Sequence, residues 1–151
     1  MRTIVVATFL AAAVAGCGRG DEPAERAGDA PAILESTPWL DKVPERETDV
    51  IHVYAFGRGE GVYVSGNAYK GTYEAFRFFA EDDRLRLRFL DENKTYDARF
   101  KIESVKHRIF DWKLTLDDPP RGPKVYYGFD HDHGDRVREL PPRVLRLLRA
   151  P

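Results

Sequence analysis

Cysteine is almost absent from this chain: Cys17 is the only one in 151 residues. No second thiol is present to pair with it, so the fold must be held by an apolar core and not by internal disulfides. Long apolar runs are missing as well. The uncharged apolar run near the start, residues 3–15, covers 13 residues. A helix needs about 20 to cross a bilayer core, so a permanent transmembrane helix is a poor interpretation.

Neither sign of charge is in excess. The chain has 24 Lys and Arg against 25 Asp and Glu. Removing the first 16 residues takes Arg2 away and leaves 23 against 25, a net of about −2. No strong single-sign field remains for capturing nucleic acid, so we expect no nucleic-acid partner.

Motifs for catalysis are also scarce. There is no Gly-x-Ser-x-Gly sequence, and Ser36, Ser65 and Ser104 have no histidine beside them in the sequence. Carboxylates are abundant, but alternating strands expose them, so no acid and base pair can be picked out. We therefore expect a protein that is not an enzyme.

The start of the chain has the features of a secretory signal. Met1-Arg2 is a short positive leader, the apolar run follows, and Val14-Ala15-Gly16-Cys17 ends it. These four residues resemble the lipobox of bacterial lipoproteins. The resemblance implies removal of residues 1–16, lipidation of Cys17 through a thioether to diacylglycerol, and acylation of the new amino terminus, which gives a stable membrane anchor. In enterobacterial lipoproteins an Asp after the lipidated cysteine tends to keep the protein in the inner membrane; by this resemblance Gly18 favours the outer membrane, with the protein facing the periplasm.

Composition divides the mature chain into a tether and one β domain. Residues 17–32 are predicted to be a flexible, acidic tether, because they have no aromatic or long aliphatic side chain. Residues 33–150 are expected to form the domain. Its first part, residues 33–43, contains Trp39 and a Thr37-Pro38 pair typical of a helix start, and is interpreted as a short helical turn.

From residue 49 to residue 129 the hydrophobic period is two, as in half-buried antiparallel strands. Short polar connections of hairpin length separate the strands. Seven strands are counted: residues 50–56, 61–65, 68–80, 84–89, 95–103, 110–117 and 124–129. The expected fold is all-β, a small antiparallel meander closed as a barrel or packed as a sandwich.

The general plan resembles a lipocalin: a lipoprotein anchor, Trp39 near a short helical turn, a series of hairpins and a late helix. The resemblance implies a cup for apolar ligands. Trp39, however, lies in Thr-Pro-Trp and not in Gly-x-Trp, the Thr-Asp-Tyr signature is missing, and seven strands are counted where eight would close the barrel. No binding residue is carried over. Whether aromatic side chains fill the interior or line a ligand pocket stays open.

Two segments near the end carry further hypotheses. His131, His133 and Asp135 could complete a divalent-metal site, since two imidazoles two residues apart share a face of an extended chain; a solvated loop is the alternative. Residues 140–149 are expected to form a short helix. The wider segment 136–149 contains five arginines and one glutamate. That helix could dock on the barrel or lie on anionic lipid headgroups.

Together these patterns indicate a lipid-anchored binding or interaction module of the cell envelope. Two classes of partner stay open at this point. One is a small apolar molecule held inside the barrel, and the other is an envelope protein that contacts its outer surface. A metal-binding role ranks below both, and no other cofactor is expected.

Overall fold

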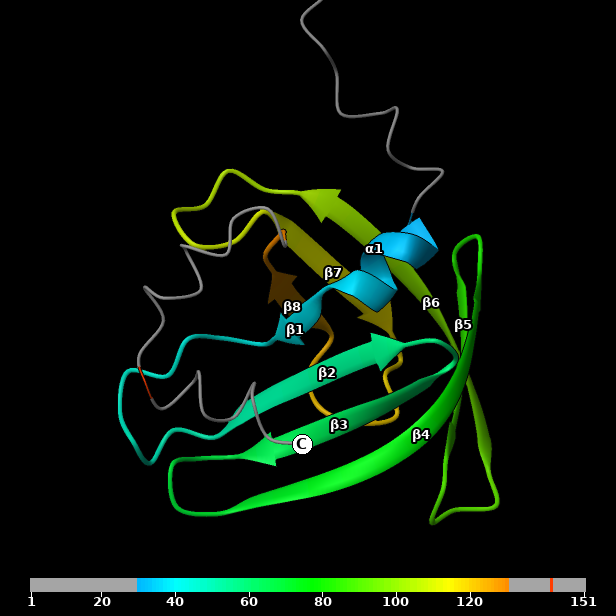
Figure 1. Ribbon diagram of the computed structural model, residues 1–151, viewed down its shortest axis with the longest axis horizontal. Coiled ribbons are helices and arrows are strands. Elements are labelled where there is room, and N and C mark those ends of the chain that lie inside the picture. The colour runs from blue at the N-terminus through cyan, green and yellow to red at the C-terminus, as the bar shows by residue number, and fades with distance from the viewer. Residues whose placement is uncertain (1–29, 131–141, 143–151) are drawn as a thin grey trace, which may run out of the picture.

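The computed structural model describes residues 30–130 and residue 142. Its described part is all-β: one closed antiparallel barrel of eight strands with one short helix (Figure 1). The elements are α1 (Ala30–Ser36), β1 (Pro38–Leu40), β2 (Ile51–Gly57), β3 (Glu60–Gly66), β4 (Gly71–Glu81), β5 (Arg84–Phe89), β6 (Thr95–Ser104), β7 (Trp112–Asp117) and β8 (Val125–Gly128).

The strands follow one another around the barrel in sequence order, and β1 closes it by pairing with β8 at Leu40 and Tyr127. The seven predicted strands correspond to β2–β8. The eighth strand, β1, lies inside the segment that was interpreted as a helical turn. That interpretation was wrong in part, because the helix is α1 and Pro38 begins a strand. Proline suits the first residue of a strand because it has no N–H to donate to the ladder.

Tight turns set the register of the hairpins. Arg58 and Gly59 connect β2 to β3, and both have positive φ angles, 51° and 82°. A two-residue turn with left-handed backbone at both positions matches the right-handed twist of the paired strands. The glycine cluster at residues 57–61 therefore forms the hairpin turn between these two strands.

Helix α1 lies at one end of the barrel. Leu34 of α1 is wholly buried with the interior cluster, and the indole N–H of Trp39 donates to the Leu34 carbonyl oxygen at 3.0 Å. The Glu35 carboxylate accepts from the backbone N–H of Arg58, in the β2–β3 turn, at 3.1 Å. Consecutive strands alternate in direction, so this end also holds the β4–β5 turn. The opposite end, here called the mouth, holds the β5–β6 and β7–β8 loops.

Aromatic rings pack the interior. Tyr54 is at the centre, with its ring centroid 4.9 to 5.8 Å from those of Phe56, Tyr63, Phe76 and Tyr126. The pair with Phe56 is stacked and the other three are tilted or edge-on, and such ring pairs add to the free energy of burial. Inward-facing side chains from all eight strands join this cluster.

A second apolar cluster lies on the outward face of β1, β2, β3 and β8. Leu40, Ile51, Val53 and Val64 point away from the interior by register, yet each is buried. The outward face of β4, by contrast, carries exposed Tyr73 and Phe79. The wall of the barrel is thus buried on one side and open on the other.

Candidate functional site: the barrel mouth and the outer wall

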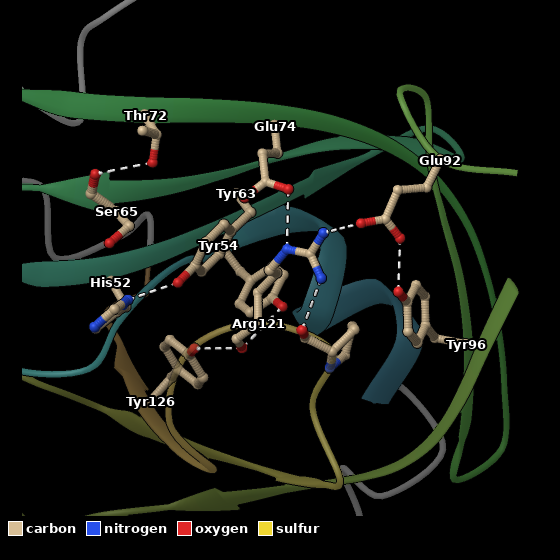
Figure 2. Close-up of polar contacts among 11 residues, drawn as sticks. His52, Tyr54, Tyr63, Ser65, Thr72, Glu74, Glu92, Tyr96, Arg121 and Tyr126 are labelled. Atoms are coloured by element: carbon tan, nitrogen blue, oxygen red, sulfur yellow. Dashed lines mark hydrogen bonds and ion pairs between the residues drawn. The ribbon is translucent and has the colours of Figure 1, made fainter. Parts of the chain in front are cut away.

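The β7–β8 loop, residues 118–124, contributes the polar centre of the mouth. Its Arg121 side chain reaches the carboxylates of Glu74 on β4 and Glu92 in the β5–β6 loop (Figure 2). The Arg121 Nε to Glu74 Oε2 distance is 2.9 Å, and Arg121 Nη2 donates to Glu92 Oε1. One guanidinium therefore joins three segments far apart in the sequence, in the fork geometry that arginine offers to carboxylates.

Further contacts hold this guanidinium in place. It lies over the Phe89 ring, 4.6 Å from the centroid, and Nη1 donates to the Pro120 carbonyl oxygen at 3.0 Å. Burial would lower the pKa of Arg121, but its hydrogen bonds to Glu92 and Glu74 outweigh burial and raise the pKa. The Tyr96 hydroxyl donates to Glu92 Oε2 at 2.6 Å. That bond, together with the one from Arg121, holds the pKa of Glu92 below its usual value.

Two tyrosines of the barrel interior hold the backbone of the β7–β8 loop. The hydroxyls of Tyr54 and Tyr126 donate to the carbonyl oxygen of Arg121 at 3.2 and 3.4 Å (Figure 2). Burial raises the pKa of both tyrosines, so both are protonated donors at neutral pH. Gly122 follows with φ of 66°, and a Cβ there would meet the Tyr126 hydroxyl and lie 3.1 Å from the Tyr63 hydroxyl. Only glycine fits this close approach without strain.

A second polar group lies beside the loop. His52 Nδ1 and the Tyr63 hydroxyl are 2.6 Å apart, and the backbone N–H of His52 donates to Asp41 Oδ1 at 2.8 Å. Burial raises the pKa of the Asp41 carboxyl and that of the Tyr63 hydroxyl. Each of these groups has a partner within the barrel, which is the pattern of a structural network that closes the mouth.

The interior below the mouth is filled with side chains. Trp39, Tyr54, Leu87, Phe89, Leu114 and Tyr126 all have 0% relative exposure. A chamber large enough for an apolar ligand would expose the side chains that line it to a water-sized probe. Among the described residues the inward-facing positions therefore form a packed core, as expected for a narrow barrel.

The outward face of β4 and β5 has a different character. Phe79 and Tyr73 are 61% and 55% exposed, and Leu90, just after β5, is 61% exposed. Arginine occupies each outward position of β5: Arg84, Arg86 and Arg88 are exposed between the buried Leu85, Leu87 and Phe89. Aromatic residues and arginine are enriched at the centres of interfaces, so this surface is a candidate for contact.

The site residues predicted from the sequence lie outside this description. Cys17 precedes residue 30, and His131, His133 and Asp135 fall between residues 130 and 142. Within residues 30–130, no group of three or more His, Cys, Asp or Glu side chains is placed to hold a metal ion. The described part of the chain also has no helix long and apolar enough to span a bilayer.

Sequence reasoning missed the mouth cluster. Glu74, Glu92 and Arg121 are separated by 18 and 29 positions and belong to no motif. A local signal existed in Pro119-Pro120-Arg121-Gly122-Pro123, a stiff turn that offers one side chain in a fixed place. Which carboxylates that side chain would meet depends on strand register around the closed barrel.

Comparison with family models, with curated proteins and with solved structures finds no match to this chain. A role must therefore be argued from the residues themselves.

Proposed function

We propose that this chain is a lipid-anchored protein of the cell envelope whose barrel is a packed interaction module, working through its outer wall and not by carrying an apolar molecule inside. The anchor is the lipobox-like sequence ending at Cys17, with Gly18 favouring the periplasmic side of the outer membrane.

The observation that carries the second part is the burial of the side chains at the centre of the interior. The Tyr54 and Tyr126 rings are 5.3 Å apart, and both residues, like Phe89, have 0% exposure. A ligand of even ten carbon atoms would have to displace these rings, which costs packing free energy throughout a close-packed core. Entry would also require breaking the Arg121 contacts that close the mouth. Contact through the outer wall needs neither change.

The test compares the natural interior with one that has been hollowed. Phe76 is 1% exposed and its ring centroid lies 5.4 to 5.8 Å from those of Tyr54, Phe56 and Phe89. Phe76→Ala should leave a dry apolar cavity, which takes up small apolar molecules such as benzene or xenon. The chain from residue 18 onward keeps every described element and is the sample. Leu87→Ala is a second, smaller deletion, for use if Phe76→Ala does not fold.

We expect benzene to raise the melting temperature of the hollowed variants and to leave that of the natural chain unchanged. Native mass spectrometry of protein purified from its own membranes should show no apolar molecule bound beyond the covalent lipid. One equivalent of a fatty acid or phospholipid, released when Phe76 is replaced by the larger Trp, would contradict the packed-module proposal and support the ligand-carrier class.

A further inference from the structure

The open side of the barrel wall combines positive charge with exposed rings. We define the β4–β5 wall as the charged and large apolar residues that face outward from these two strands and are exposed, together with the residue after β5: Tyr73, Arg77, Phe79, Glu81, Arg84, Arg86, Arg88 and Leu90. It contains four arginines and one glutamate, so its charge is about +3. Two carboxylates on neighbouring strands pair with this wall: Asp97 on β6, 2.8 Å from Arg86, and Glu60 on β3, 3.5 Å from Arg77.

Some arginines of the β4–β5 wall lie directly opposite another arginine on the neighbouring strand. Arg77 on β4 is directly opposite Arg88 on β5, and Arg84 on β5 is directly opposite Arg99 on β6. Like charges at opposed positions destabilise a sheet. Arg84 and Arg99 form no ion pair with another described residue. Carboxylates flank both pairs, because Glu60 lies 3.5 Å from Arg77, and Glu81 and Asp117 lie in register beside Arg84 and Arg99. Arg84 and Arg88, which have no ion pair within 4 Å in the described part of the chain, are the arginines that an external anionic surface would stabilise most.

The rings are interleaved with these arginines. Phe79 lies in register with Arg86, between the Arg77–Arg88 pair and the Glu81–Arg84 pair. Phe79 and Leu90 are both 61% exposed, and Tyr73 is 55% exposed, which leaves three large apolar side chains along one stripe. Apolar rings that enter the headgroup boundary, flanked by arginines that bind phosphate, are the composition of a surface that lies on a bilayer.

The neighbouring hollow does not explain the stripe as a pocket for one small anion. A hollow of about 630 Å³ extends from β4 to β7, and Phe79, Arg84 and Arg86 of the wall are among the residues that line it. Its arginines, Arg84, Arg86 and Arg99, are outnumbered by four carboxylates, those of Glu81, Asp97, Asp117 and Asp118. The wall's positive charge continues beyond this hollow to Arg77 and Arg88, which do not line it, and this spread suits an extended anionic surface better than an enclosed anion.

The position of the stripe fits a membrane partner. Only 12 residues lie between Cys17 and Ala30, where α1 begins, and the 13 steps from one to the other span at most about 45 Å. The β4–β5 turn, with Arg84 beside it, belongs to the same end of the barrel as α1 (Figure 1). A lipid on Cys17 therefore keeps this end near the bilayer, and a surface held so close needs little affinity of its own.

We infer that the β4–β5 wall docks on the anionic phospholipid headgroups of the membrane to which the chain is tethered, with Phe79 entering the headgroup boundary. This inference rests on the proposed lipid anchor for its biological setting. It is tested without the anchor, on the chain from residue 18 onward, so that its failure and a failure of lipidation at Cys17 can be told apart.

The experiment places a tryptophan reporter on the stripe. Both native tryptophans are buried, Trp39 at 0% and Trp112 at 8% exposure, so they give a background insensitive to vesicles. In Phe79→Trp we expect a blue shift of emission with phosphatidylcholine vesicles that contain phosphatidylglycerol, quenching by brominated lipid, and loss of the shift at high salt. Tyr69→Trp, at a side chain 72% exposed in the β3–β4 turn, should show no shift.

Charge removal supplies the matched control. On the Phe79→Trp background, Arg84→Gln with Arg88→Gln should weaken partitioning about 10- to 30-fold, since each surface arginine contributes about a tenfold factor or less. Lys42→Gln with Lys70→Gln removes the same charge from exposed positions at the mouth and should change partitioning less than threefold. An absent shift in Phe79→Trp, an equal shift in Tyr69→Trp, or equal losses in the two charge variants would overturn the inference.

Discussion

Arg121 and Glu74 meet across the mouth of the barrel, with Arg121 Nε 2.9 Å from Glu74 Oε2 and both side chains about three-quarters buried, at 24% and 23% exposure. This ion pair joins the β7–β8 loop to β4, a strand on the other side of the barrel. Since the Arg121 carbonyl oxygen also accepts from two tyrosine hydroxyls, one residue holds the loop by its side chain and by its backbone.

Replacing Arg121 should loosen the mouth. Arg121→Met keeps the apolar stem over Phe89 but leaves Glu74 facing another carboxylate without a cation. We expect the free energy of unfolding to fall by about 1 to 3 kcal/mol, the range for hydrogen bonds to charged groups. Urea unfolding measures the change, and amide exchange of residues 118–124 should speed up. Arg86→Met, which breaks an exposed pair with Asp97, is the control and should cost at most about 1 kcal/mol. Equal costs would contradict the role given to Arg121.

Gly122 should not tolerate a side chain. Its φ of 66° is left-handed, and a Cβ would collide with the Tyr126 hydroxyl. Gly122→Ala should therefore destabilise the fold by about 1 to 2 kcal/mol from the backbone alone, plus the cost of moving Tyr126. Gly57→Ala is the matched variant, because a Cβ at Gly57 meets nothing within 4 Å. A melting temperature lowered equally by both substitutions would mean that the close approach at Gly122 is not a constraint.

Acid should weaken the contacts at the mouth in a defined window. Hydrogen bonds from Tyr96 and Arg121 hold the pKa of Glu92 below its ordinary value of 4.5. A carboxyl with a depressed pKa contributes stability that is present above the unfolded value and is lost as pH falls through the folded value. As pH falls below 4.5, the free energy of unfolding should decrease less in Tyr96→Phe than in the natural chain, because the Tyr96 bond that lowers the pKa of Glu92 is gone. Urea unfolding at a series of pH values measures this difference. Tyr73→Phe, which removes an exposed hydroxyl, should leave the pH profile unchanged.

Trp39 should anchor α1. Its indole N–H donates to the Leu34 carbonyl oxygen at the buried end of the helix, and Trp39→Phe leaves that acceptor without its partner. The expected cost is about 1 to 3 kcal/mol, together with faster amide exchange in α1. Trp112→Phe removes a similar ring without a described indole hydrogen bond. A larger loss of α1 protection in Trp112→Phe would show that packing, and not this bond, holds the helix.

Much of the fold could be predicted because alternation is a strong signal in single strands. Arg84 to Phe89 alternates without error, and the seven strands counted from the sequence correspond to β2–β8. Strand β1 could not be predicted from the sequence. Its three residues, Pro38, Trp39 and Leu40, are too few to show a period of two, and a Thr-Pro pair is also typical of a helix start. The stretch 68–80 was counted as one strand. In the structure, β4 begins at Gly71.

The candidate site was much harder to predict. The contact of Arg121 with Glu74 and Glu92 requires closure of the barrel by β1 and β8, which no local pattern reports. Whether the interior was hollow or filled also depended on closure and on how the rings of Tyr54, Phe76 and Tyr126 fit together. The alternating arginines of β5 can be read from the sequence. The exposed aromatic rings beside them belong to β4, and which ring lies next to which arginine depends on the register between the two strands.

The anchor is the part of the proposal on which the others depend, and the mass of the protein extracted from cell membranes tests it most directly. Top-down mass spectrometry should give a chain that begins at Cys17 and carries a diacylglyceryl group on sulfur and an acyl chain on the new amino terminus. A membrane-extracted or secreted chain with a free thiol at Cys17, or one that still contains residues 1–16, would contradict it.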